Sequence, residues 1–228
     1  MGNDQLLEKP VIDIANLLSR GWTACNFEVE TESALKNGLI TLAKQLGTPV
    51  ALRPGRELCD KRQPTDASLA KPHSLSRKFS LGEFPCHSDT AHWLTPCRFV
   101  ILACLSPGAA DRRTVLLDTK HLSLDKANMA LLHSAPFRIE NGRNSFFGTI
   151  LSKCRSFVRC DPGCMAPLAR DGVRALDVFS KAHWSSHIEE IRWAQGRAVV
   201  IENWRVLHGR GGAQCIDRDR ILLRILVQ

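Results

Sequence analysis

The chain has 228 residues, of which 44% are hydrophobic and 24% are charged, a balance typical of globular proteins that excludes a disordered or fibrous chain. No apolar run reaches the roughly 18–20 residues that cross a bilayer, and the first residues lack the basic and apolar segments of a secretory signal. The formal net charge of +8 permits an anionic partner, although the basic residues are scattered and form no run. We therefore expect one cytoplasmic domain over residues 1–228, without a membrane anchor.

The first half of the chain predicts one helix, one long loop and two strands. Residues 31–46 place apolar side chains at helical spacing and end before Gly47, a favourable C-cap residue. Residues 53–76 are polar and contain several prolines, so we expect a long loop of the kind that can cover a binding site. Two short apolar segments, 99–105 and 114–118, predict strands.

The second half mixes helices with short strands. Residues 124–133 and 167–182 predict helices, the second of which starts with proline, the favoured first helical residue. Strands are expected over residues 156–160, 197–202 and 221–227, and the last two are rich in β-branched and apolar residues. Because strands and helices do not alternate regularly, these elements favour a β-sandwich or barrel core with added helices over a doubly wound parallel sheet.

The cysteines indicate neither disulfide bonds nor a structural metal site. There are nine, an odd number without any C-x-x-C pair, which argues against a disulfide framework in a cytoplasmic chain. Cys154, Cys160 and Cys164 lie close together in sequence, but their spacing does not match a zinc finger or ribbon. We interpret them as thiols of the core or of loops.

One short motif, Phe84-Pro-Cys-His87-Ser-Asp89, carries metal-ligand chemistry. Residues two apart on a strand point to the same face, so His87 and Asp89 would present an imidazole and a carboxylate side by side. Alone this motif is weak, because it occurs by chance in many proteins. His208, which follows the predicted strand 197–202, is the natural third ligand. Two histidines and one carboxylate on one face of a metal select non-haem Fe(II), although zinc could use the same ligands.

Two arginines mark the last predicted strand. Arg220 and Arg224 fall on one face of it by the period of two, and burying them unpaired would be costly. They become favourable if each meets a carboxylate, whose geometry a guanidinium matches through paired hydrogen bonds. The alternative is an edge strand whose two arginines are solvated.

Taken together, His87-x-Asp89, His208 and Arg220 resemble the ligand and cosubstrate residues of the Fe(II)/2-oxoglutarate-dependent dioxygenases, specifically the taurine dioxygenase (TauD/TfdA) superfamily. The segment Asn203-Trp-Arg-Val-Leu-His-Gly-Arg210 is similar to the distal-histidine segment of gamma-butyrobetaine hydroxylase. The resemblance implies a β-rich α+β fold, with a double-stranded β-helix (jelly roll, cupin-like) core and flanking helices. The chain departs from the family in being shorter than most members.

The same resemblance assigns roles to individual residues. It implies that Fe(II) is bound by the catalytic residues His87, Asp89 and His208. It implies that Thr114 and Arg220 hold the cosubstrate 2-oxoglutarate, with Arg220 on the C5 carboxylate, although the Gly-Gly pair usual before this threonine is absent. Arg224 matches a position that contacts an acidic group of the substrate in some members. Trp93 and Arg210 are also expected at the substrate site, because they lie near the ligands in sequence.

These roles predict an oxidoreductase, a hydroxylase or desaturase that uses Fe(II), O2 and 2-oxoglutarate and forms succinate and CO2. Its substrate is expected to be small and either anionic or amino-acid-like. Two alternatives stay open: an oxygenase that acts on a macromolecule, and a non-catalytic, oxygenase-like regulatory protein. A nucleic-acid partner is disfavoured because few aromatic residues interleave with the basic ones. The sequence also leaves a homo-oligomer open.

Overall fold

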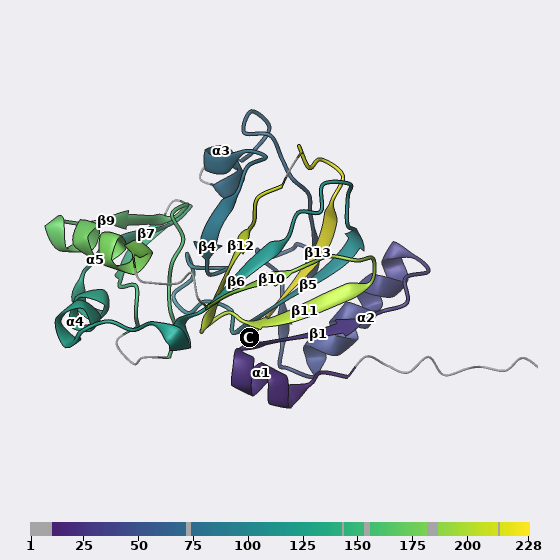
Figure 1. Cartoon of the computed structure of the whole chain (residues 1–228), viewed down its shortest axis with the longest axis horizontal. Helices are drawn as coiled ribbons and strands as arrows, with labels where there is room; N and C mark the ends of the chain where they lie inside the picture. The colour runs from purple at the N-terminus through teal and green to yellow at the C-terminus, as the bar shows by residue number, and fades with distance from the viewer. Residues whose placement is uncertain (1–10, 72–73, 143, 153–155, 182–186, 214) are drawn as a thin grey trace, which may run out of the picture.

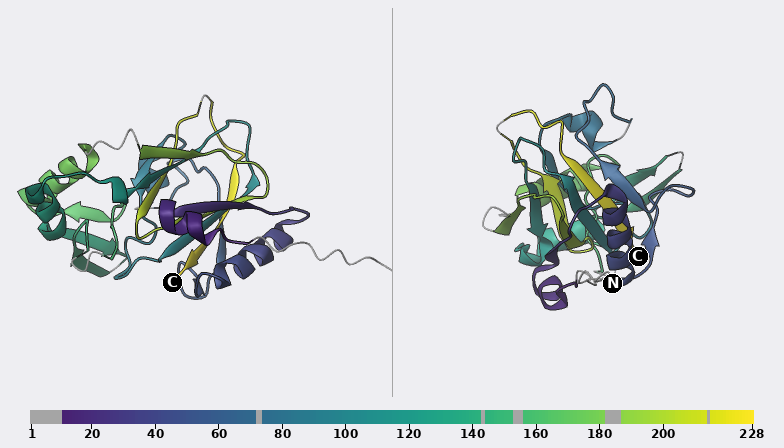
Figure 2. Two further views of the ribbon diagram at one scale, coloured as in Figure 1. Left: turned by 60° about the horizontal axis from the view of Figure 1, so that its bottom comes forward. Right: turned by 90° about the vertical axis from the view of Figure 1, so that its right-hand side faces the viewer.

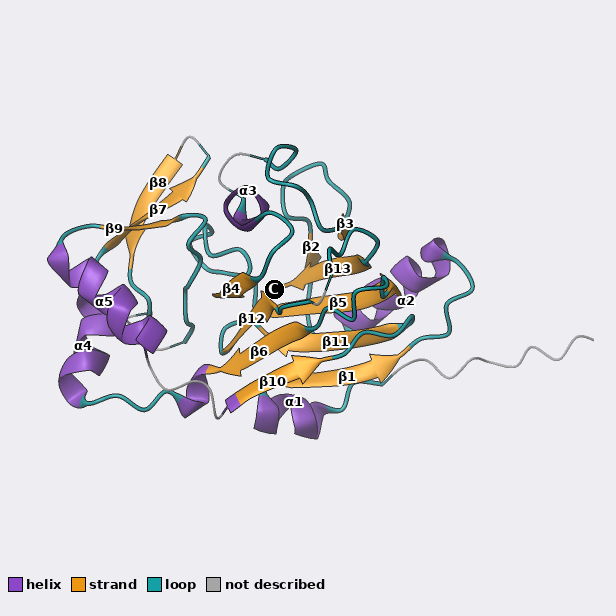
Figure 3. Ribbon diagram, turned by 45° about the horizontal axis from the view of Figure 1, so that its top comes forward, coloured by secondary structure: helices purple, strands orange, loops and turns teal. Residues whose placement is uncertain are grey.

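The computed structural model describes residues 11–71, 74–142, 144–152, 156–181, 187–213 and 215–228. Its strands form three antiparallel sheets, and its helices lie around them (Figures 1 and 3). The helices are α1 (Ile14–Arg20), α2 (Glu32–Lys44), α3 (Leu75–Phe79), α4 (Lys126–Ser134) and α5 (Arg170–Lys181). Among the described residues, no helix combines the length and the apolar character needed to cross a bilayer.

Two of the sheets pack against each other and form the core of the molecule. The larger sheet has the order β1-β11-β5-β13-β2, with β3 also paired to β13. Its strands are β1 (Trp22–Asn26), β2 (Pro49–Val50), β3 (Cys59–Arg62), β5 (Phe99–Ser106), β11 (Arg197–Glu202) and β13 (Ile221–Val227). The second sheet has the order β10-β6-β12-β4. Its strands are β4 (Phe84–His87), β6 (Thr114–Asp118), β10 (Ile188–Ile191) and β12 (Val206–Arg210).

Strand β13 shows how the larger sheet is covered on both faces. Leu222 and Leu226 lie between the two sheets, in one cluster with Leu116 of β6. The alternate residues of β13 point to the other face of the sheet and belong to a second cluster, which includes the buried side of α2. They are Leu223, Ile225 and Val227. Figure 2 shows α2 lying along the larger sheet. A strand buried on both faces needs apolar residues at nearly every position, which is why 221–227 is so apolar.

Helix α2 confirms the helix predicted over residues 31–46. The Thr31 side chain accepts a hydrogen bond from the Ala34 N–H at 3.0 Å and caps the first turn. The apolar positions of the helix are buried, namely Leu35, Leu39, Leu42 and Ala43. The helix ends at Lys44 with Gln45 as its C-cap, so Gly47 is not the cap residue. A Cβ at Gly47 would instead collide with the carbonyl oxygen of Gln228.

Replacing Leu39 with alanine should lower the free energy of unfolding by about 2–5 kcal/mol, because the side chain is fully buried and its removal leaves a cavity. Urea unfolding followed by circular dichroism measures this loss. Leu18→Ala is the matched control, since Leu18 of α1 is 68% exposed and its loss should change stability by less than about 0.5 kcal/mol. Equal midpoints for the two variants would contradict the packing described for α2.

The segment 53–76 is not one long loop, so that prediction is wrong in part. It contains β3, which pairs with β13, and the start of α3. The sequence of β3, Cys59-Asp-Lys-Arg62, is polar because its charged side chains find partners on both sides of the sheet. Asp60 pairs with Arg224, and Lys61 pairs with Glu32 of α2. A polar edge strand of this kind has no hydrophobic alternation for a sequence pattern to detect.

The third sheet lies to one side of the other two, together with α4 and α5 (Figure 1). Its strands are β7 (Phe137–Asn141), β8 (Asn144–Gly148) and β9 (Met165–Pro167). The strand predicted over 156–160 is reduced to a single bridge between Leu151 and Val158. The helix predicted from Pro167 begins at Arg170, because Pro167 is the last residue of β9.

The structure confirms the remaining predicted strands and helix, namely β5, β6, β11, β13 and α4. The cysteines are free wherever the structure describes them. Cys160 and Cys164 pack against the apolar cluster between α4, α5 and the third sheet, as expected for thiols of the core. Cys154 lies outside the described residues.

Candidate metal centre

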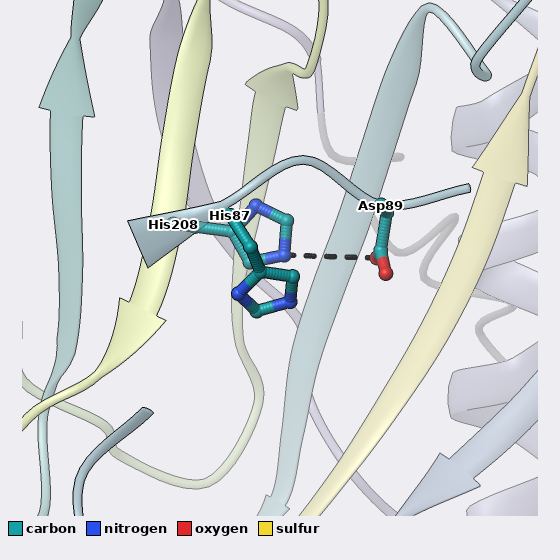
Figure 4. Close-up of side chains that lie close together, drawn as sticks. All are labelled: His87, Asp89 and His208. Carbon is teal, nitrogen blue, oxygen red and sulfur yellow. Dashed lines mark ion pairs between the residues drawn. The ribbon is translucent and has the colours of Figure 1, made fainter. Parts of the chain in front are cut away.

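His87, Asp89 and His208 come together beside the second sheet (Figure 4). His87 is the last residue of β4, and His208 occupies the paired position on β12, so the two rings share a face of the sheet. Their ring centroids are 4.8 Å apart, and His208 Nε2 lies 3.6 Å from Asp89 Oδ2. One ligand atom from each residue lies within 4.8 Å of the other two, so a single ion can reach all three.

The ligand atoms of these side chains are available to a metal. His87 Nδ1 lies 3.1 Å from the carbonyl oxygen of Pro85, and a proton on Nδ1 leaves Nε2 free to bind. Asp89 Oδ2 is buried, and it has no hydrogen-bond partner among the described residues. An unpaired buried polar atom costs about 1–3 kcal/mol, so this oxygen favours a ligand. Three such residues fit a divalent metal with open positions, as at non-haem iron sites.

The surroundings of His87 and Asp89 favour the protonation states that bind metals. Burial lowers the pKa of His87, and the neighbouring His208 lowers it further, while Asp161 and Asp89 oppose both effects. Burial alone would raise the pKa of Asp89, but Arg224 and His208 outweigh it and hold the pKa well below its ordinary value. Metal ligation requires a neutral imidazole and an ionised carboxylate, and the structure favours both.

Arg224 holds Asp89 from the larger sheet. Its Nη1 donates to Asp89 Oδ1 at 2.6 Å, while Nε and Nη2 donate to the two carboxylate oxygens of Asp60 at 3.1 and 2.9 Å. The Arg224 side chain is only 5% exposed, so the alternative of a solvated arginine on this strand is wrong. The guanidinium holds Asp89 through Oδ1, and Oδ2 stays without a hydrogen-bond partner among the described residues.

Asn203, in the connection between β11 and β12, fixes the backbone at Asp89. Its Oδ1 accepts from the Asp89 N–H at 2.8 Å, and its Nδ2 donates to the Asp89 carbonyl at 3.0 Å and to the Cys97 carbonyl at 2.8 Å. The residue is completely buried. The sequence did not single out Asn203 for a role, although it stands five residues before His208 in the segment that carried the family resemblance.

The structure brings the predicted cosubstrate residues to one region. Arg220 Nη1 donates to the carbonyl oxygen of Arg112 at 3.0 Å, and this carbonyl lies two residues before Thr114. Thr114 Oγ1 accepts from Trp193 Nε1 at 3.0 Å, which leaves the hydroxyl proton free to donate elsewhere. The carboxylate of the buried Asp217 lies 3.4 Å from the Nε atoms of both Arg112 and Arg220.

This region carries more positive than negative charge. Burial, together with the positive charges of Arg112 and Arg220, lowers the pKa of Arg210 to about 10, while Asp217 opposes this shift. Three buried guanidinium groups thus influence one another around one carboxylate. Such an excess of buried positive charge is stabilised by an anion.

Arg210 and Trp93 were both predicted at the substrate site, and each has contacts within the protein. Arg210 Nε donates to the Gly82 carbonyl at 2.7 Å, and its guanidinium lies 3.8 Å from the centroid of the Phe84 ring. Trp93 is half-buried, and its carbonyl accepts from Arg159 Nη1 at 2.6 Å. Arg159 is a buried residue that the sequence left without a role. It fastens the turn after Asp89 to the part of the molecule that contains the third sheet.

Comparison with known proteins supports the fold. No protein-family model matches the chain, and no curated protein sequence matches it. The crystal structure of the non-haem iron oxygenase OrfP with Fe and alpha-ketoglutaric acid aligns with a TM-score of 0.71 at 19% identity, covering 95% of this chain and 78% of that one. OrfP with Fe, succinate and (3S)-hydroxy-L-Arg aligns with a TM-score of 0.71 at 18% identity, covering 95% and 80%.

A second oxygenase gives the same result. The crystal structure of asparagine oxygenase in complex with Fe(II), 2S,3S-3-hydroxyasparagine and succinate aligns with a TM-score of 0.70 at 18% identity, covering 94% of this chain and 77% of that one. The expected jelly-roll core of antiparallel strands is therefore confirmed. This chain has the cupin-like fold of the Fe(II)/2-oxoglutarate oxygenases.

Proposed function

We propose that the chain is an Fe(II)- and 2-oxoglutarate-dependent oxygenase that hydroxylates or desaturates a small, amino-acid-like substrate, forming succinate and CO2. The observation that carries the proposal is the convergence of His87, Asp89 and His208 in this fold, with the buried Oδ2 of Asp89 left unpaired among the described residues. The structural neighbours are oxygenases crystallised with iron and with alpha-ketoglutaric acid, succinate or hydroxylated amino acids. Bound iron and cosubstrate would supply the oxidising chemistry.

The protein's own contribution is to position the metal and the cosubstrate. We assign the two histidines and Asp89 to the metal, with Asp89 oriented by Arg224 and by Asn203. We assign Arg220 to the C5 carboxylate of 2-oxoglutarate. The excess of arginine over aspartate around Asp217 supports this role, because a carboxylate bound there would balance the charge.

Thr114 is the second residue that we assign to 2-oxoglutarate. Its hydroxyl oxygen accepts the Trp193 indole N–H. The hydroxyl therefore has its own proton to donate, and a carboxylate oxygen is a suitable acceptor. Trp193 is buried between the two sheets, so it fixes the direction of this donor. Trp193 is thereby a positioning residue for Thr114.

Anaerobic addition of Fe(II) and 2-oxoglutarate to the protein is expected to give a visible charge-transfer band. Replacing Arg220 with alanine should weaken 2-oxoglutarate binding about tenfold to a hundredfold, because a charge-assisted hydrogen bond contributes roughly 1.5–3 kcal/mol. Titration of the band with 2-oxoglutarate measures the change. Arg113→Ala is the matched control, since the Arg113 side chain is 43% exposed and pairs with Glu190 on the surface.

Two outcomes would contradict the proposal. Folded wild-type protein without the band would exclude the metal and cosubstrate together, and it would favour a non-catalytic protein. Unchanged 2-oxoglutarate affinity in Arg220→Ala would exclude Arg220 as the anchor. Circular dichroism and Fe(II) affinity, measured on the same variant, separate loss of the anchor from loss of the fold.

A further inference from the structure

Strand β3 carries two charged side chains toward the metal centre. Its residues pair with β13 in the register Asp60 to Arg224 and Arg62 to Leu222, and paired residues of neighbouring strands share a face of the sheet. Arg224 on this face reaches Asp89. Arg62 therefore leaves the sheet on the side of the metal centre, whereas Lys61 between them points to the other side.

The contacts of Lys61 confirm this alternation. Its Nζ lies 2.7 Å from Glu32 Oε2, and Glu32 belongs to α2, which covers the outer face of the larger sheet. Lys61 and Arg62 are thus neighbours in sequence with similar side-chain exposure, 42% and 46%, on opposite faces. Figure 3 shows β3 beside β13.

Arg224 is poorly placed to bind a substrate anion, because two carboxylates already occupy it. Three of its N–H groups donate to Asp60 and Asp89, and the side chain is buried. An incoming anion would have to compete with both aspartates. The family resemblance gave Arg224 the role of binding an acidic group of the substrate. If a substrate anion binds on this face, a different cation must therefore hold it.

Arg62 is better placed than Arg224 to donate hydrogen bonds to an incoming anion. Among the described residues, the ion pair of Arg62 is with Asp60, at 3.6 Å from its Nε, and Arg224 already binds that carboxylate. Burial and Arg224 lower the pKa of Arg62, while Asp60 and Asp89 raise it. The guanidinium thus lies on the same face of the sheet as Arg224, with 46% of its side chain open to solvent.

We propose that Arg62 binds the carboxylate of the prime substrate and selects for carboxylate-bearing molecules such as amino acids. A guanidinium matches a carboxylate through paired hydrogen bonds. With a divalent metal bound at Asp89, the cations of this face outweigh Asp60 and Asp89, which favours an anionic group. The inference rests on the proposed function and deepens it, since it names the chemical group that orients the substrate beside the metal.

The test uses wild-type protein loaded anaerobically with Fe(II) and 2-oxoglutarate, and its probes are the common L-amino acids and their α-amides. Binding is measured by thermal shift and calorimetry. At least one amino acid should bind, and its amide should bind at least about tenfold more weakly, because the amide lacks the charge. Arg62→Gln should weaken binding of that acid about tenfold to a hundredfold, with Arg62→Lys intermediate.

Lys61→Gln is the matched control, because it removes the same charge from the same strand on the other face, and it should bind the acid like wild type. The charge-transfer band should persist in Arg62→Gln, since in the described part of the chain no hydrogen bond or ion pair joins Arg62 to the proposed ligands or cosubstrate residues. Equal binding of acid and amide, or unchanged binding in Arg62→Gln, would overturn the inference. A wild-type protein that shows the band but binds no amino acid would overturn it too. A missing band would instead overturn the proposed function.

Discussion

Replacing Asp89 with alanine is expected to abolish stoichiometric Fe(II) binding and all succinate formation. Asp89 is the single carboxylate of the proposed ligand set, and its Oδ2 is buried toward His208 without another partner among the described residues. Loss of an outer-shell contact already costs 10–100-fold in metal affinity, so loss of the ligand should cost more than about 100-fold. Calorimetric titration with Fe(II) under anaerobic conditions measures the affinity.

Two further variants make this result specific. Asp89→Glu keeps the carboxylate and should retain part of the affinity, whereas Asp111→Ala removes an exposed carboxylate elsewhere and should leave it unchanged. If Asp89→Ala bound one equivalent of Fe(II) as tightly as wild type, the assigned ligand set would be wrong. Urea unfolding of the metal-free variant establishes that any loss arises at the site rather than from the fold.

Replacing Arg224 with leucine should lower the stability of the metal-free protein by about 3–5 kcal/mol. The substitution removes one partner of a buried ion pair and leaves Asp89 without its counter-charge, which is the costly way to break such a pair. Asp60 loses its two hydrogen bonds from Arg224 at the same time. Urea unfolding of wild type and variant measures the difference.

A bound divalent cation should restore part of that stability, because it replaces Arg224 as the counter-charge of Asp89. Adding Mn(II) should therefore stabilise Arg224→Leu by more than it stabilises wild type. Arg98→Leu is the control: Arg98 is 49% exposed and lies 3.8 Å from Glu202, and a surface pair contributes at most about 1 kcal/mol. If Arg224→Leu unfolded at the same urea concentration as wild type, the ion pairs would not contribute to stability.

Sequence patterns predicted those helices and strands whose buried faces appear as a regular arrangement of apolar residues. Strands β5 and β13 are covered on both faces, so they appear as short apolar runs, and α2 shows one apolar stripe. Strand β3 was missed because it lies at an edge and satisfies its charges through distant partners. The helix after β9 was placed three residues early, because Pro167 favours a helix start but here ends a strand.

For the candidate site, too, local sequence patterns identified some features, whereas others depend on distant parts of the chain. Sequence alone singled out His87, Asp89 and His208 as candidate ligands and gave their order, but the strand geometry expected for the first two is wrong. Strand β4 ends at His87, and Asp89 lies beyond it, where Asn203 holds its backbone. It also singled out Arg220 and Arg224, but Arg220 precedes β13, whose pairing with β5 shifts register between Ile221 and Leu222.

Only the tertiary structure decided what those residues meet. Arg224 contacts Asp89 across 135 positions of sequence and Asp60 across 164, and these contacts exist because the two sheets pack together and β3 pairs with β13. The same pairing turns Arg62 toward the metal centre and Lys61 away from it. Spacing fixes the direction of a side chain within its own strand, but packing between distant segments fixes its partner.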